Sequence, residues 1–160
     1  FNSCILNLEA LENKILFKIN NEIITSIDLK NEINYLTSTN QNIKSLTKKE
    51  VIEVGTNSLI REKIKKIELL KYVKKIELDE KFLDNIIKDF YLRINLNNEK
   101  ELKDYLSQNG VEYSYMVNKL SLNTLWNKLI FDKYSSKIII NKKAIKNEIL
   151  SKKNFIKQFN

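Results

Sequence analysis

Apolar and polar residues alternate over residues 15–19, and this pattern predicts a half-buried β-strand near the N-terminus. Asn20 and Asn21 follow, and asparagine tolerates the left-handed backbone conformation that a tight hairpin turn requires. Ile23 and Ile24 then begin a return strand. The pattern therefore predicts a two-stranded β-hairpin.

After the hairpin, apolar residues recur every three or four positions in several long stretches, which is the spacing of an amphipathic helix. Thr25 and Thr47 each precede an acidic residue by three positions, as a capping box at a helix start requires. Asp79 and Asn98 are further N-cap candidates, and Gly110 is a helix-ending residue. The predicted helices lie at about 26–38, 48–75, 80–94, 99–108 and 112–135.

A short β-branched run at residues 138–140 predicts a third strand that meets the hairpin, and Asn141 caps a last helix through Ile145 and Ile149. The expected fold class is therefore mainly α. We expect an extended multi-helix domain with a small β-hairpin near the N-terminus and a short strand near the C-terminus.

The composition excludes several kinds of active site. The chain has no histidine and one cysteine, Cys4, which excludes a histidine-based triad, a histidine-containing zinc site and a disulfide within the chain. It has no glycine-rich phosphate loop, and no pair of carboxylate, lysine or tyrosine residues stands out by its spacing. We therefore predict no catalytic residue, no metal site and no cofactor in these residues.

The net charge of +8 raises the possibility of an acidic partner such as nucleic acid. Acidic residues are interleaved with the lysines, however, and this favours an ordinary solvated surface over a binding stripe. Direct readout of bases depends largely on arginine, and the chain contains only Arg61 and Arg93. Nucleic acid is therefore not the expected partner, although a basic helical nucleic-acid-binding protein is kept as an alternative.

The expected domain organisation has three parts. Residues 1–13 are interpreted as the remnant of a secretory signal peptide or as a flexible arm. Residues 14–150 form the main domain, and residues 151–160 form a linker or the start of a following domain. No apolar run reaches the 18 residues that a membrane-spanning helix needs, so we predict no transmembrane segment.

The order of these elements resembles the N-terminal domain of the SurA family of periplasmic chaperones, which shares a peptide-binding architecture with trigger factor. The resemblance depends on the order of four segments, namely residues 14–33, 58–87, 102–120 and 137–149. It implies an ATP-independent periplasmic chaperone domain that binds unfolded outer-membrane proteins and assists their assembly. Members of this family usually continue into parvulin-type prolyl isomerase domains, so the resemblance places any isomerase activity in the parent protein and outside this segment.

A chaperone of this kind needs side chains that bind many sequences, and aromatic and methionine side chains suit that task. Such residues gather around the junction of the fourth and fifth predicted helices and at the end of the third. The candidate peptide-binding residues are Tyr91, Tyr105, Tyr113, Tyr115 and Met116. Their expected ligands are unfolded outer-membrane proteins or aromatic-rich peptides.

The alternative is that these side chains are ordinary core residues at helical spacing. Core packing is favoured for Phe90, Met116 and Trp126, whereas Tyr91, Tyr113 and Tyr115 are expected to be exposed. A further alternative is that the domain has no client and serves as a structural tether for a downstream isomerase.

Overall fold

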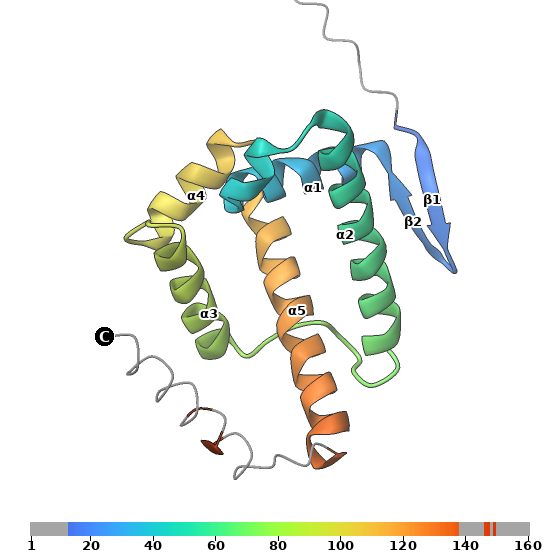
Figure 1. Cartoon of the computed structure of the whole chain (residues 1–160), viewed down its shortest axis with the longest axis vertical. Coiled ribbons are helices and arrows are strands. Elements are labelled where there is room, and N and C mark those ends of the chain that lie inside the picture. The colour runs from blue at the N-terminus through green and yellow to red at the C-terminus, as the bar shows by residue number, and fades with distance from the viewer. Residues whose placement is uncertain (1–12, 138–145, 148, 150–160) are drawn as a thin grey trace, which may run out of the picture. The chain divides into compact units, whose positions relative to one another are not determined.

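A computed structural model describes residues 13–137, 146, 147 and 149, and the chain divides into two units, residues 1–126 and residues 127–160. The described part is mainly helical with one small antiparallel hairpin, which confirms the predicted fold class (Figure 1). The strand predicted at residues 138–140 lies outside the described residues, as does most of the last predicted helix. The elements are β1 (Ile15–Ile19), β2 (Glu22–Thr25), α1 (Ser26–Thr39), α2 (Lys48–Leu69), α3 (Glu80–Arg93), α4 (Glu99–Gln108) and α5 (Tyr113–Tyr134), with short 3-10 helices at Gln41–Ser45 and Ser135–Lys137.

The hairpin forms as its sequence pattern predicts. Strands β1 and β2 pair antiparallel, with Phe17 opposite Ile24 and Ile19 opposite Glu22. Asn20 adopts a left-handed backbone conformation with φ of 52°, which an asparagine accepts more readily than most residues. Local turn chemistry is therefore sufficient to reverse the chain here.

Both predicted capping boxes are present. The Thr25 hydroxyl accepts a hydrogen bond from the Asp28 N–H at 3.2 Å, and the Asp28 carboxylate accepts one from the Thr25 N–H at 2.8 Å. Thr47 and Glu50 repeat this exchange at the start of α2, at 3.4 Å and 2.8 Å. The predicted N-caps Asp79 and Asn98 also accept from backbone N–H groups three residues ahead. Each box satisfies N–H groups that the first helical turn leaves without partners.

The main hydrophobic core of the first unit joins α3, α4 and the start of α5. Its buried members are Ile87, Phe90, Leu102, Leu106, Val111 and Met116. Each large apolar side chain that leaves water here contributes about 1.5–3 kcal/mol. Gly110 makes the tight connection from α4 to α5 possible, because its φ of 66° is strained for residues with a side chain.

Helices α1 and α2 approach each other closely at Gly55, which is buried in the middle of α2. A Cβ atom built on Gly55 would lie 3.1 Å from Leu29 Cδ1 and 3.2 Å from Ile33 Cγ1. Glycine costs about 1 kcal/mol relative to alanine inside a helix, so close packing against α1 is the physical reason for a glycine at this position.

Helix α2 is shorter than predicted. The apolar periodicity extends to about Lys75, but the helix ends at Leu69, which is 1% exposed. Residues 74–79 have no helical or strand structure, and Ile76 from this connection lines a cavity beside α2 and α5. The prediction was wrong because apolar periodicity marks the face of a helix but not the residue at which it ends, and no glycine or proline follows Leu69 to mark that end.

The described part of the second unit comprises the end of α5, the 3-10 helix that follows it, and the helical residues 146, 147 and 149. Lys128 and Asp132 form an ion pair of 3.1 Å one helical turn apart. Phe131 is 69% exposed. In the part of the chain that the structure describes, no helix has the length and hydrophobicity needed to cross a membrane.

Candidate functional site

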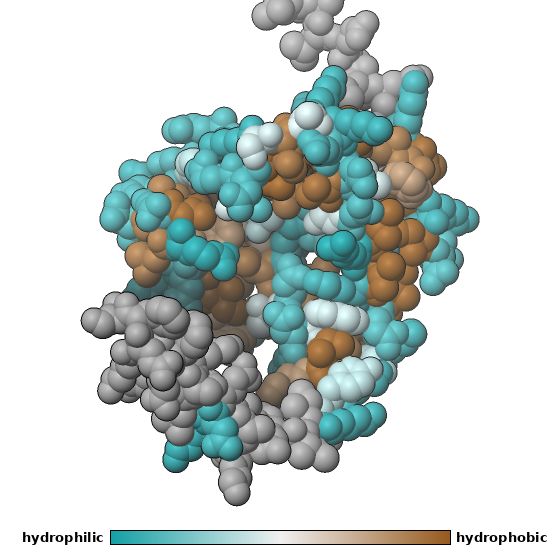
Figure 2. Space-filling view, viewed as in Figure 1, coloured by the Kyte–Doolittle hydropathy of each residue, from teal (hydrophilic) through white to brown (hydrophobic). Residues whose placement is uncertain are grey.

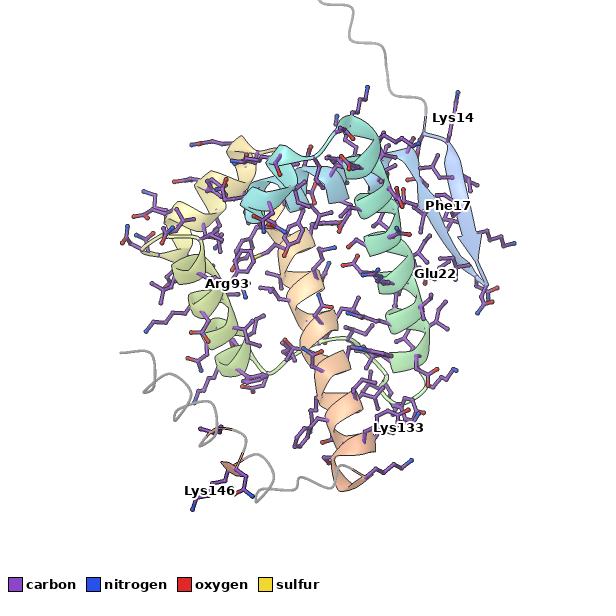
Figure 3. The ribbon with its side chains drawn as sticks, in the orientation of Figure 1. Lys14, Phe17, Glu22, Arg93, Lys133 and Lys146 are labelled. Atoms are coloured by element: carbon purple, nitrogen blue, oxygen red, sulfur yellow. The ribbon has the colours of Figure 1, made fainter. Side chains whose placement is uncertain are left out.

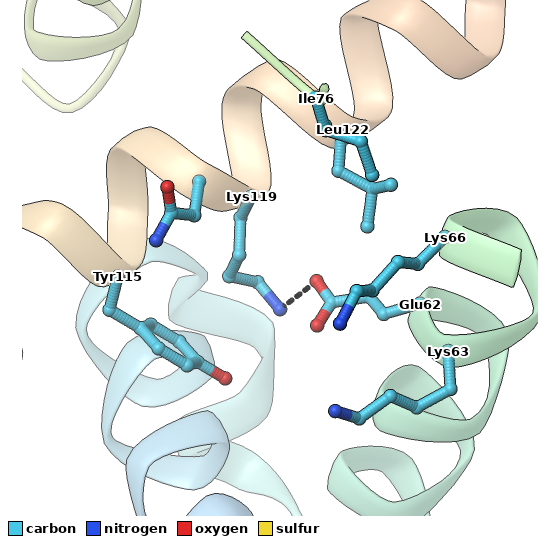
Figure 4. Close-up of a pocket in the computed structure, with 8 residues that line it drawn as sticks. Glu62, Lys63, Lys66, Ile76, Tyr115, Lys119 and Leu122 are labelled. Atoms are coloured by element: carbon cyan, nitrogen blue, oxygen red, sulfur yellow. Dashed lines mark hydrogen bonds and ion pairs between the residues drawn. The ribbon is translucent and has the colours of Figure 1, made fainter. Parts of the chain in front are cut away.

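A buried polar network links three helices of the first unit. Lys119 of α5 is only 6% exposed, and its ammonium lies between Glu32 of α1 and Glu62 of α2. Lys119 Nζ donates to Glu32 Oε2 at 2.5 Å and also to Glu62 Oε1. The Tyr115 hydroxyl donates to Glu32 Oε2 at 2.6 Å. Figure 4 shows Lys119 facing Glu62, with the Tyr115 ring beside them.

Aromatic rings support the buried ammonium. Lys119 Nζ lies 5.0 Å from the Tyr35 ring centroid and 5.3 Å from that of Tyr115, and the two rings pack edge to face. The negative faces of such rings attract a cation, most strongly where water is excluded. The sequence thus surrounds one buried charge with two carboxylates and two aromatic rings.

The network contains two carboxylates and a single buried ammonium, and this imbalance affects its protonation. Burial raises the pKa of Glu62 above its ordinary value, and the nearby Lys119 only partly offsets that effect. Burial also raises the pKa of Tyr35 to about 12, with further contributions from the negative charges of Glu32 and Glu62. The pKa of Tyr115 is raised for the same reasons. The two tyrosines therefore stay neutral at ordinary pH.

Two cavities lie against this network. The first, which we call the Ile76 cavity, has a volume of about 330 Å³ and includes Lys63, Lys66 and Leu122 in its wall (Figure 4). The second, which we call the Arg61 cavity, has a volume of about 370 Å³ and includes Glu32 in its wall. Glu62 and Lys119 line both cavities. Long polar side chains, rather than close backbone packing, therefore connect α2 to α5.

A second feature of the first unit is an exposed apolar surface on the hairpin and the start of α1. We call it the hairpin surface and define it by Ile15, Leu16, Phe17, Ile23 and Ile27. The exposed fractions of these side chains range from 39% for Leu16 to 67% for Ile15. Figure 2 shows apolar residues gathered over the hairpin, and Figure 3 places Phe17 on β1.

Ion pairs hold the hairpin against α2. Glu22 of β2 accepts from Lys63 Nζ at 2.9 Å and from Lys66 Nζ at 2.7 Å. Hydrogen bonds from Lys66 and Lys63 lower the pKa of the Glu22 carboxyl, so it stays ionised and paired at neutral pH. These contacts hold the hairpin against α2, while the apolar residues of the hairpin surface stay exposed.

The structure places the predicted peptide-binding residues in or beside the helical core. Met116 is 0% exposed, as core packing requires, and Phe90 at 3% is also a core residue. Tyr91, Tyr113 and Tyr115 were expected to be exposed, but all three are only partly accessible and the expectation was wrong. Client binding at this cluster stays a prediction, and Met116 has no accessible surface with which to contact a client.

The tyrosine hydroxyls in this cluster make specific intramolecular hydrogen bonds. Tyr105 donates to the Ser38 carbonyl at 2.6 Å, and Tyr113 donates to Glu99 Oε1 at 2.9 Å. These bonds, like that of Tyr115 to Glu32, connect elements of the first unit to one another. A buried tyrosine needs a partner for its hydroxyl, and here the partner is another part of the fold.

Sequence reasoning did not identify Glu32, Glu62 or Lys119. A signal for Glu32 was present, because it lies on the apolar face of α1 beside Leu29 and Ile33. Charged residues are almost never fully buried unless they are paired, so a charge on an apolar helix face points to a buried partner. The identity of that partner could not be read from the sequence.

Among the described residues, no three histidine, cysteine, aspartate or glutamate side chains are grouped so as to hold a metal ion. Comparison with known protein families, with curated proteins and with solved structures gives no match to this chain. Membership of the SurA family therefore stays a prediction from the order of its sequence segments.

Proposed function

We propose that this domain is an ATP-independent chaperone that binds apolar segments of unfolded polypeptides on the hairpin surface. The observation that carries the proposal is the exposure of five large apolar side chains on one small hairpin and the adjoining helical turn. Several large apolar side chains exposed on so few residues are uncommon on soluble proteins outside interaction sites. Their attraction for a client is non-directional, so it suits binding without strict sequence preference.

The hairpin also offers a backbone template. The described part of the sheet has only the strands β1 and β2, so the outer edge of β1 has no strand partner among the described residues. An extended client segment can add to such an edge through main-chain hydrogen bonds while its side chains contact the neighbouring apolar residues. The hairpin surface therefore combines two modes of recognition that do not depend on a particular client sequence.

The proposal differs from the sequence-based prediction in the location of the binding surface. The predicted tyrosine cluster is tied into the fold by hydrogen bonds, whereas Ile15 and Phe17 are 67% and 42% exposed. Unfolded outer-membrane proteins as clients and a periplasmic location follow from the family resemblance and are proposed on that ground.

The test is suppression of aggregation of an unfolded porin-type client by the full chain. The double variant Ile15→Ser with Phe17→Ser is expected to lose most of this activity while keeping its circular dichroism spectrum. The matched control is Phe82→Ser with Leu92→Ser on α3, which removes two apolar side chains that are also exposed, both at 51%. Equal activity of the double variant and the wild type would contradict the proposal, and so would an equal loss in the control.

A further inference from the structure

Glu32 lines the Arg61 cavity, and one oxygen of its buried carboxylate has no partner among the described residues. Glu32 is 0% exposed, and its Oε2 atom accepts the hydrogen bonds from Lys119 and Tyr115. Its Oε1 atom has no hydrogen-bond donor among the described residues. An acceptor that has left water without gaining a donor is unfavourable, and each such atom calls for an explanation. The cavity beside Glu32 has room for a molecule that supplies the donor.

Charge is unevenly distributed around the same cavity. At its inner end, Glu32 and Glu62 share the single ammonium of Lys119. Arg61 also lines the cavity but is exposed to solvent, and no described residue accepts a hydrogen bond from its guanidinium or forms an ion pair with it. Lys65 donates to Asn123 Oδ1 at 2.6 Å and adds positive charge to the wall. The inner end therefore favours a hydrogen-bond donor with positive charge, and Arg61 favours a carboxylate.

We propose that the Arg61 cavity binds a small zwitterion that carries a primary ammonium and a carboxylate, of the amino-acid class. The ammonium donates to Glu32 Oε1, and the carboxylate accepts from Arg61. Tyr35, Leu36 and Val54 contribute to the wall and suit a short aliphatic spacer between the two charges. A volume of about 370 Å³ falls within the range of small-molecule sites. The proposal does not depend on the chaperone function, because the hairpin surface shares no residue with this cavity.

The first experiment is an NMR titration of the full chain with glycine and with γ-aminobutyrate, which separate the two charges by different lengths. Butylammonium and butyrate serve as probes that carry only one of the charges. We expect saturable shifts of resonances around Glu32, Arg61 and Lys119 with at least one zwitterion, and at least tenfold weaker binding of both single-charge probes. The absence of any saturable shift would mean that only water occupies the cavity, and it would overturn the proposal. Equal binding of a zwitterion and of a single-charge probe would overturn it as well.

The second experiment compares the only two arginines of the chain. Arg61→Gln is expected to weaken zwitterion binding about tenfold with no loss of folded structure, because Arg61 has no partner in the described fold. Arg93→Gln is the matched control, since Arg93 lies over the Phe90 ring and is not part of the cavity wall. Unchanged affinity of Arg61→Gln, or equal weakening in both variants, would contradict the assignment. Glu32→Gln, where it folds, is expected to abolish binding.

Discussion

At the scale of single residues, the buried Lys119 depends on the charged groups around it. Moving an ion pair out of water costs several kcal/mol per ion, and the attraction between the partners offsets this only when both are present and hydrogen-bonded. Lys119 meets this condition through Glu32, Glu62 and two aromatic rings. The residue is thus important for stability because its removal leaves two carboxylates without their cation.

Replacement of Lys119 by methionine is expected to lower the free energy of unfolding by about 3–5 kcal/mol at neutral pH. Methionine replaces the apolar part of the lysine side chain and lacks the ammonium, so the loss reports the charge. Urea unfolding followed by circular dichroism measures the change. The control Lys128→Met removes an exposed lysine with an ion pair to Asp132, and it is expected to cost no more than about 0.5 kcal/mol. Equal effects of the two variants would show that Lys119 is not a buried charge in solution.

The raised pKa of Glu62 gives stability a defined dependence on pH. Between the ordinary value of 4.5 and the raised value in the folded protein, the folded state holds a proton that the unfolded state releases. The contribution of Glu62 to the free energy of unfolding is therefore largest below the unfolded pKa and falls as the pH rises through the folded one.

Glu62→Gln removes this contribution. The stability of the variant relative to the wild type is expected to increase as the pH rises from about 4 to neutral, the range in which carboxyl groups ordinarily titrate. Urea unfolding of both proteins over a pH series measures the difference, and groups common to both proteins cancel. A difference that does not change with pH would mean that the pKa of Glu62 is not raised.

At the scale of the elements, helix starts are encoded by interactions within four residues. Thr25 and Thr47 each exchange two hydrogen bonds with an acidic side chain three positions ahead. Such signals need no tertiary contact, and the sequence identified both starts correctly. The end of α2 has no comparable signal, and its predicted position was wrong by several residues.

Thr47→Ala is expected to destabilise the protein by about 1 kcal/mol, because the first turn of α2 loses the side chain that accepts the Glu50 N–H. Thr56→Ala is the matched control. It makes the same chemical change within α2, where threonine has a lower helix propensity than alanine, and it is expected to cause little loss. Thermal or urea unfolding of both variants measures the difference. A loss in Thr56→Ala as large as in Thr47→Ala would contradict a capping role.

At the scale of the whole molecule, the net charge of +8 bears on how a client reaches the domain. Interspersed charges of both signs do not define a binding stripe, but a positive net charge attracts an acidic chain at long range. In the proposed function, charge therefore increases the rate of encounter, and the hairpin surface provides the affinity after contact.

The association rate with an acidic unfolded client is expected to fall on the order of tenfold as salt is raised from low to high ionic strength. The dissociation rate is expected to change much less, because apolar contact is not screened by salt. Stopped-flow fluorescence with a labelled client measures both rates. An association rate that is independent of salt would remove charge from the mechanism.

The difference between local and long-range interactions explains which predictions from the sequence succeeded. The hairpin and the helix starts were predicted because period-two alternation, turn residues and capping residues act over a few positions. The exposure predicted for Tyr91, Tyr113 and Tyr115 was wrong because the burial of a tyrosine depends on distant partners. Tyr105 bonds to a residue 67 positions away, and Tyr115 bonds to one 83 positions away.

The sequence by itself thus determined the fold class, the hairpin and the starting points of helices α1 to α5, since the energies that decide them are local. Only the tertiary structure decided that Glu32 and Lys119 are buried together, because a buried charge is stable only beside a partner that the chain brings from elsewhere. It also decided that Ile15 and Phe17, which alternate as a half-buried strand would, stay exposed. Alternation specifies that side chains point to opposite faces, but only the packing of other elements determines which face is covered.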